Sequence, residues 1–207
     1  MSTSSLWGLD KDYKGSEEVE FSNSWWFSPI AWDILFQKYL PEKVTVQFGS
    51  RTNFMTATMF DKTIEGDLNE KINNSEVIED RIVWELSMQQ IFFTKDKELV
   101  VESIKHFLET NKEFAGDCGE HIYERFNEVA DEISKLEEAD HPYFVFKNTS
   151  VDDAVEYWFQ KYDEEEEEYE EASLRDMDRH VAEFVFIEDG KITGFKSNMQ
   201  YFDSDVA

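Results

Sequence analysis

The segment Gly119–Glu138, GEHIYERFNEVADEISKLEE, carries the most regular apolar pattern of the chain. Its large apolar residues recur at alternating intervals of four and three: Ile122, Phe126, Val129, Ile133 and Leu136. That spacing puts them on one face of an α-helix. The segment is therefore predicted to form a long amphipathic helix whose apolar face packs against a folded core.

The flanking sequence predicts a mixture of helices and strands. Further helices are expected where apolar residues recur at helical spacing, at residues 28–40, 75–88, 96–110 and 150–162. Strands are expected at residues 19–22, 43–48, 53–60, 143–147, 181–187 and 191–197. Asp189-Gly190 is a strong hairpin turn between the last two strands, and residues 49–52 are expected to join 43–48 to 53–60 as a second hairpin.

These elements predict an α+β fold, an antiparallel sheet with helices packed on one side. The chain has 207 residues, of which 41% are hydrophobic and 15% aromatic, so it can bury a core. We expect a single domain over residues 1–207. An alternative sub-division has a strand-rich part at 1–62 and a part at 75–207 that contains the middle helices and the C-terminal hairpin.

The charge of the chain restricts its partners. Asp and Glu number 47 against 20 Lys and Arg, which gives a formal net charge of −27. Nucleic acids and anionic membranes carry the same sign, so unaided binding to either is opposed. The composition favours a basic protein as the partner.

The helix predicted near Gly119–Glu138 has an acidic face opposite its apolar face. This face holds five acidic residues: Glu120, Glu124, Glu128, Asp131 and Glu132. Four of them follow one another at intervals of four, which costs about 0.2–0.5 kcal/mol per pair through like-charge repulsion. Successive carboxylates at that interval rise by about 6 Å along the helix. They form either a solvated helix face or an interface that imitates a polyanion.

A second acidic region extends from Lys161 to Glu183, where eleven acidic residues stand against three basic ones. We expect its first part to continue the preceding helix or to be disordered. The candidate partner-binding residues here are Glu164, Glu165, Glu166, Glu167, Glu168, Glu170 and Glu171. In the binding hypothesis, these carboxylates and those of the helix take the phosphate positions of a nucleic-acid-binding enzyme and release its counterions.

Aromatic residues supply candidate anchors for such an interface. Trp25 and Trp26 are adjacent and point in different directions, so at least one of them is expected to be exposed. Tryptophan is enriched among interface residues that dominate binding energy. Trp32, Phe36 and Trp158 are expected in the core.

No motif for nucleotide binding, zinc-dependent hydrolysis or calcium binding occurs, and the sequence implies no cofactor and no metal. Cys118, with His121 three residues on, is interpreted as structural. Asp176 to His180 form a weak candidate for a metal site.

The sequence also lacks a secretory signal, so a cytoplasmic location is expected.

The segment Glu18–Phe48, EVEFSNSWWFSPIAWDILFQKYLPEKVTVQF, resembles the start of small ferredoxin-like proteins carried by mobile elements. The residues that carry the likeness are Trp26, Ser28, Pro29, Trp32 and the run Tyr39-Leu40-Pro41. The resemblance implies a ferredoxin-like core with a helical insertion. In charge and composition the chain is similar to acidic antirestriction and anti-CRISPR proteins of phages and plasmids, some of which mimic nucleic acid.

These observations favour a non-catalytic inhibitor that binds the basic nucleic-acid-binding groove of a host defence nuclease, alone or as a ribonucleoprotein. Three alternatives remain open. The chain could be an immunity protein that captures a cognate toxin, or a metal-dependent hydrolase that uses Asp176 and Asp178. It could also be a structural or virion protein whose acidic surfaces only maintain solubility.

Overall fold

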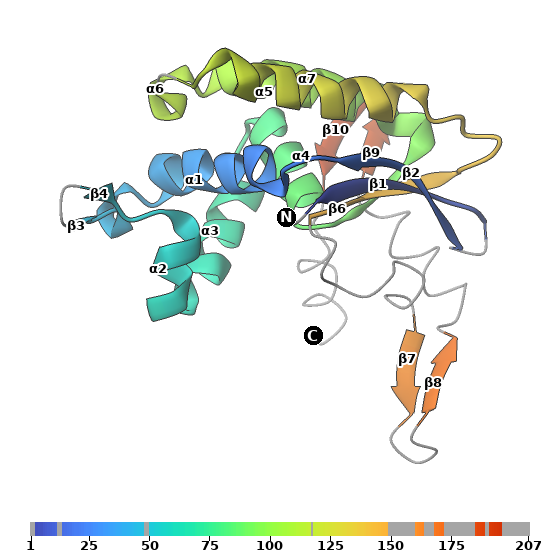
Figure 1. Cartoon of the computed structure of the whole chain (residues 1–207), viewed down its shortest axis with the longest axis horizontal. Coiled ribbons are helices and arrows are strands. Elements are labelled where there is room, and N and C mark those ends of the chain that lie inside the picture. The colour runs from blue at the N-terminus through green and yellow to red at the C-terminus, as the bar shows by residue number, and fades with distance from the viewer. Residues whose placement is uncertain are drawn as a thin grey trace. The chain divides into compact units, whose positions relative to one another are not determined.

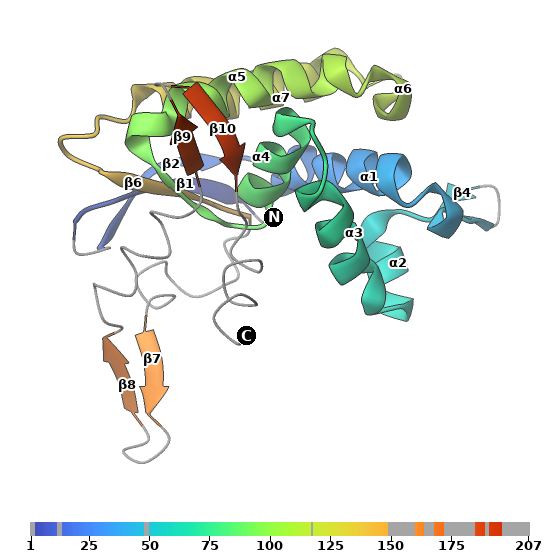
Figure 2. The same cartoon turned by 180° about the vertical axis from the view of Figure 1, so that it is seen from behind.

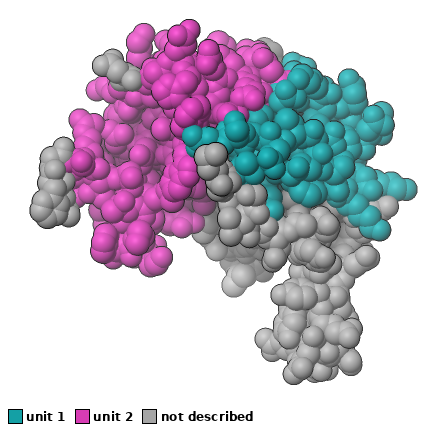
Figure 3. Space-filling view, in the orientation of Figure 1, with its two compact units in different colours: residues 1–24, 89–98, 132–207 teal, residues 25–88, 99–131 magenta. Residues whose placement is uncertain are grey.

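The computed structural model describes residues 3–11, 14–47, 50–116, 118–148, 160–163, 168–171, 185–188 and 191–195 (Figure 1). It has an antiparallel sheet and a set of helices, which confirms the predicted α+β class. The chain divides into two compact units, each built from separate stretches of sequence (Figure 3). Unit 1 comprises residues 1–24, 89–98 and 132–207, and unit 2 comprises residues 25–88 and 99–131.

Unit 1 contains a four-stranded antiparallel sheet with the strand order β2-β1-β6-β5. Its strands are β1 (Ser4–Leu9), β2 (Gly15–Phe21), β5 (Ile91–Phe93) and β6 (Tyr143–Lys147). Of these four strands, the sequence predicted β6 over its full length and the last part of β2. Five of the six residues of β1 are buried, so this strand lacks the alternation of apolar and polar residues that identifies a half-buried strand.

Aromatic residues form much of the core around this sheet. Phe21 lies 5.8 Å from Phe146, and Phe92 stacks on Phe144 at 5.7 Å, both measured between ring centroids. The 3-10 helix η3 (Thr94–Asp96) follows β5. Next to it, the Lys97 ammonium donates to the carbonyl oxygens of Ser134 and Leu136, at the C-terminal end of α7 (Glu120–Lys135). A cation at this end is favourable because the last carbonyls of a helix lack partners within it.

The later part of unit 1 contains two hairpins. The strands β9 (Val185–Glu188) and β10 (Lys191–Phe195) pair as predicted on either side of Asp189-Gly190. The other hairpin pairs β7 (Gln160–Asp163) with β8 (Glu168–Glu171). The helix predicted over 150–162 is therefore wrong at its end, as is continued helix or disorder at residues 168–171. In this hairpin Lys161 is the backbone partner of Glu170. Pairing between strands therefore determines the structure here, although the spacing of apolar residues suggested a helix.

Unit 2 is mainly helical. Its helices are α1 (Ser28–Tyr39), α2 (Phe54–Phe60), α3 (Thr63–Asn73), α4 (Ile78–Ser87), most of α5 (Lys97–Thr110), α6 (Lys112–Ala115) and the first twelve residues of α7. It also contains most of the 3-10 helix η1 (Ser24–Trp26), together with η2 (Pro41–Lys43) and the short hairpin of β3 (Val46–Gln47) and β4 (Ser50–Arg51). The predicted helices at 28–40, 75–88, 96–110 and near 119–138 are confirmed.

The core of unit 2 joins helices that are distant in sequence. Phe126 of α7 lies 4.7 Å from Phe27 and stacks on Phe107 of α5 at 5.9 Å, measured between ring centroids. Phe126 belongs to the apolar face predicted from the sequence, and it is buried. Accordingly, α5 and α7 run side by side, as both views of the chain show (Figures 1 and 2).

Residues 53–60 were expected to form a strand, and this prediction is wrong because residues 54–60 form α2. The Asn53 side chain accepts a hydrogen bond from the backbone N–H of Thr56 at 2.8 Å, which caps the first turn of the helix. The Asp33 carboxylate accepts from the Phe54 N–H at 2.7 Å. The cap and this contact with α1 favour a helix over the alternating strand that the sequence suggested. The predicted hairpin shrinks to two residues on each side.

The order of elements also differs from that of the ferredoxin-like core implied by the resemblance. A ferredoxin-like sheet follows a β-α-β-β-α-β order. Here β1 and β2 are consecutive and pair as a hairpin, with no helix between them.

Candidate acidic interface

The acidic face of α7 is exposed along most of its length. Glu120, Glu124, Glu128 and Asp131 are exposed, and Glu132 is half-buried. Glu120 lies in the first turn, where the positive end of the helix dipole stabilises a carboxylate. Burial of the opposite apolar face therefore fixes these acidic side chains on the solvent side of the helix.

Basic residues neutralise the C-terminal half of this face. Asp131 pairs with Lys105 of α5 at 3.0 Å, and Glu132 pairs with Lys135 at 2.6 Å. Glu128 pairs with Arg125 at 2.7 Å, and the Arg125 side chain is almost fully buried. Three of the five acidic residues singled out in the sequence are thus held by cations of the chain itself.

The N-terminal half of the acidic face lacks such basic partners. Among the described residues, neither Glu120 nor Glu124 has a basic side chain within 4.0 Å. Nearby, burial raises the pKa of the Tyr123 hydroxyl, and the carboxylate of Glu109, its hydrogen-bond partner, raises it further. The unneutralised negative charge of α7 is therefore concentrated in its first two turns.

One of the aromatic candidates, Trp26, contacts the first turn of α7. The Trp26 indole meets the His121 imidazole edge-on, with ring centroids 4.8 Å apart and an angle of 62° between the planes. Trp25 precedes it in η1 and is 55% exposed. A Cβ at Gly119 would lie 2.7 Å from the His121 ring, so the glycine leaves room for that ring. We call Glu120, His121, Glu124, Trp25 and Trp26 the acidic-aromatic face.

The second acidic candidate is described only in part. Glu164, Glu165, Glu166 and Glu167 lie outside the described residues, as do Asp176, Asp178 and His180. Glu168, Glu170 and Glu171 are in strand β8. In the register of the hairpin, Glu168 is the backbone partner of Asp163.

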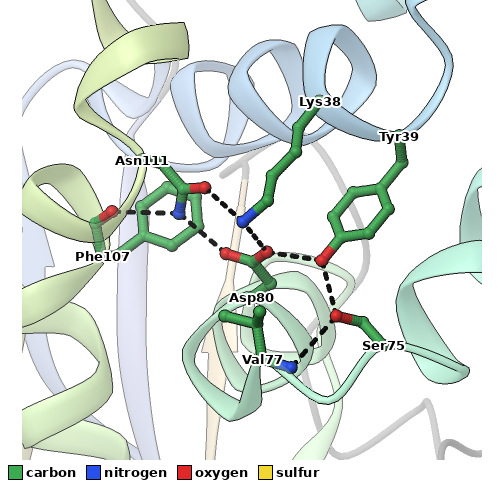
Figure 4. Close-up of polar contacts among 7 residues, drawn as sticks. All are labelled: Lys38, Tyr39, Ser75, Val77, Asp80, Phe107 and Asn111. Carbon is green, nitrogen blue, oxygen red and sulfur yellow. Dashed lines mark hydrogen bonds and ion pairs between the residues drawn. The ribbon is translucent and has the colours of Figure 1, made fainter.

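A buried polar network in unit 2 was not predicted from the sequence (Figure 4). The fully buried Asp80 carboxylate accepts hydrogen bonds from Lys38, from Tyr39 at 2.6 Å and from Asn111 at 2.7 Å. The Ser75 hydroxyl lies 2.7 Å from that of Tyr39. Spacing in the sequence gave no indication of this cluster, because its members come from α1, α4 and the segments that follow α3 and α5.

Tyr39 and Ser75 also border a cleft of about 530 Å³ in unit 2, which makes them the strongest candidates for enzymatic chemistry. Burial raises the pKa of Tyr39 well above its usual value, and the hydrogen bond to Asp80 raises it further. A tyrosine that keeps its proton is a poor base for activating Ser75. The network instead joins α1 and α4 to the end of α5, and we interpret it as structural.

Cys118 has the character of a structural thiol. Burial raises its pKa, and its Sγ lies 3.0 Å from the carbonyl oxygen of Ala115, as a weak donor would. A raised pKa disfavours the thiolate that a nucleophile or metal ligand needs. Among the described residues, no group of three or more His, Cys, Asp or Glu side chains is arranged to hold a metal ion.

Comparison with known proteins gave no match to any family model, curated protein or solved structure. Within the described ranges, none of the helices combines the length and apolar character needed to cross a membrane.

Proposed function

We propose that the chain is a non-catalytic inhibitor that occupies the basic nucleic-acid-binding groove of a defence nuclease, either a CRISPR effector or a restriction enzyme. It acts in the cytoplasm, where such nucleases meet foreign DNA. The observation that carries the proposal is the acidic-aromatic face, where Glu120 and Glu124 have no described basic partner, Trp26 contacts His121 between them, and Trp25 next to Trp26 in the chain is exposed.

The chemistry of the target follows from that face. A groove that binds nucleic acid is lined with Lys and Arg side chains whose counterions are released when an anionic ligand enters. Glu120 and Glu124 can supply such anionic groups without first breaking ion pairs of their own. The net charge of −27 steers the whole chain toward a positive groove.

Trp25 adds the apolar part of the contact. Its indole loses exposed surface when a partner covers it, and tryptophans of this kind contribute a large share of binding energy at interfaces. Charge alone attracts many basic proteins, whereas an apolar anchor next to the charge requires a matching pocket. The combination therefore favours a specific partner over a general polycation.

The proposal is tested by competition for DNA. Purified nucleases, namely a guide-loaded CRISPR effector and a restriction endonuclease, are bound to labelled duplex DNA and titrated with the chain at salt concentrations from about 50 to about 300 mM. The expected result is displacement of DNA that weakens as salt rises. Binding that leaves the DNA in place, or failure to displace DNA from any member of a broad nuclease panel, would overturn the proposal.

A matched pair of variants locates the interface. The double variant Glu120→Lys/Glu124→Lys changes the net charge by the same amount as Glu65→Lys/Asp67→Lys, whose residues are exposed on α3. We expect the first to raise the concentration needed for half-displacement at least about tenfold and the second to change it little. Equal effects of the two pairs would mean that total charge, rather than this face, governs binding.

A further inference from the structure

A second surface of unit 2 has the opposite character from the acidic-aromatic face. Helix α2 packs against α1 and α3 (Figure 2), and several of its large apolar side chains are exposed. Met59 is 72% exposed, Phe60 86% and Met55 38%. Val46, on the hairpin that leads into α2, is 68% exposed. Of the described large apolar residues that are exposed, all but Trp25 therefore fall within residues 46–60.

The charge of this segment is also exceptional. Residues 43–64 contain three basic residues, Lys43, Arg51 and Lys62, against the single acid Asp61, so the segment carries a net charge of +2 within a chain of −27. An ion pair of 3.2 Å between Lys43 and Asp61 joins the start of the segment to the end of α2. Two exposed acids, Glu42 and Glu65, border the segment in the sequence, so the charge around α2 is close to zero rather than strongly negative.

We propose that the exposed apolar residues of this segment, Val46, Met55, Met59 and Phe60, form a self-association surface through which two copies of this chain pair about a twofold axis. Two copies repel each other strongly at every acidic surface, and repulsion is weakest where the local charge is not negative. The proposed nuclease target is basic, and this surface offers it no excess of carboxylates to bind, whereas the apolar side chains of a second copy match those exposed here. The second copy therefore fits this surface better than the proposed target does.

The size of the surface sets the strength of the contact. The exposed fractions of Val46, Met55, Met59 and Phe60 correspond to about 500 Å² of apolar surface per copy, with roughly 200 Å² for a large side chain. Two copies would then remove about 1,000 Å² from water, near the lower limit of specific interfaces. The expected dimer is weak and depends on concentration.

The shape of unit 2 allows such a pairing. Val46, together with Pro41, Val44, Arg51 and Phe114, lines a shallow groove of about 380 Å³. A projecting ring such as Phe60 from the second copy can enter this groove, and the twofold axis repeats the contact in the other direction. Each copy then supplies both a projecting side chain and a recess.

The test is sedimentation velocity of the full chain over about a hundredfold range of concentration, at roughly 50 and 500 mM salt. Salt screens the repulsion between two acidic chains, so we expect the dimer to strengthen as salt rises. This is opposite to the proposed nuclease contact, which salt weakens. The dimer and the nuclease contact are therefore measured separately. The contact that is absent from its own assay identifies the proposal that fails.

Charge-neutral variants identify the surface. Met59→Gln/Phe60→Ser should weaken the dimer at least tenfold, and Val46→Thr should weaken it less. The control is Trp25→Ser, which removes an exposed apolar residue outside the segment and should leave dimerisation unchanged. Because these side chains are exposed, the thermal unfolding of each variant should match that of the parent. A parent chain that stays monomeric under every condition, or a dimer insensitive to Met59→Gln/Phe60→Ser, would overturn the proposal.

Discussion

Trp26 contacts His121 edge-on, with ring centroids 4.8 Å apart. The two residues are 95 positions apart in the sequence, and their contact brings the aromatic segment before α1 to the first turn of α7. Two features that the sequence suggested independently, an aromatic anchor and an acidic helix face, thus lie together. Because of this contact, the candidate interface is defined by particular residues and not only by the net negative charge of the chain.

The first prediction concerns the anchor. Replacing Trp25 by alanine should weaken DNA displacement roughly tenfold or more, because tryptophans at interface centres contribute about 2 kcal/mol or more. The free energy of unfolding should change little, since over half of the side chain is exposed. Competition assays and denaturant titrations measure the two effects. A variant that competes as well as the parent would exclude Trp25 from the interface.

The second prediction is that substitutions in the two halves of the acidic face change the free energy of unfolding differently. Glu128→Gln weakens the ion pair of the buried Arg125 and should cost about 1 kcal/mol. Glu124→Gln relieves like-charge repulsion at intervals of four and should be neutral or stabilising by a few tenths of a kcal/mol. Urea denaturation at low salt measures both. Equal costs for the two variants would contradict the division of the face.

The third prediction concerns the buried network. Asp80→Ala removes the carboxylate that Lys38, Tyr39 and Asn111 share, and we expect a loss of about 3–5 kcal/mol. Tyr39→Phe removes one donor and should cost about 1 kcal/mol. In a double-mutant cycle, Lys38→Met should recover part of the loss caused by Asp80→Ala, because it removes the cation left without its carboxylate. Additive losses would mean that the two side chains act independently.

The fourth prediction is a pH dependence from Glu85. Burial raises the pKa of this carboxyl to about 8, so the folded chain keeps a proton that the unfolded chain loses near pH 4.5. Between these values the folded state binds more protons, and the free energy of unfolding should fall as pH rises from about 5 to 8. Glu85→Gln should flatten this fall, while Glu65→Gln on the exposed side of α3 should leave it unchanged. Denaturation curves across this pH range provide the measurement, and a fall that persists in Glu85→Gln would assign it to other groups.

The fifth prediction uses two glycines as a matched pair. A Cβ at Gly8 would lie 2.5 Å from the His141 ring, which is paired with Glu18 at 3.2 Å. Gly8→Ala should therefore cost about 1–3 kcal/mol through displacement of that ring. Gly66 lies within α3 with open space around it, so Gly66→Ala should stabilise by about 0.4–1 kcal/mol. The melting temperatures should shift in opposite directions, and a shift of Gly8→Ala upward would show that the ring moves without cost.

Regular elements were predicted from the sequence where the residues themselves carry a strong local signal. Helix α7 and the β9–β10 hairpin are such cases, because periodicity and turn chemistry are local properties. Strand β1 was missed because it is buried on both sides. Helix α2 was mistaken for a strand because its alternating residues fit both structures, and the contact between Asp33 and the Phe54 N–H lies 21 positions away in sequence.

The sequence by itself determined the net charge, the amphipathic character of α7 and the residues that its acidic face contains, because these depend only on composition and short spacing. The tertiary structure decided which of those acids remain unneutralised. Lys105 of α5 reaches Asp131, whereas no described cation reaches Glu120 or Glu124. It also placed Trp26 at His121 and assembled the network around Asp80. Such contacts depend on how distant segments pack, and packing of a whole core is not contained in any local pattern of residues.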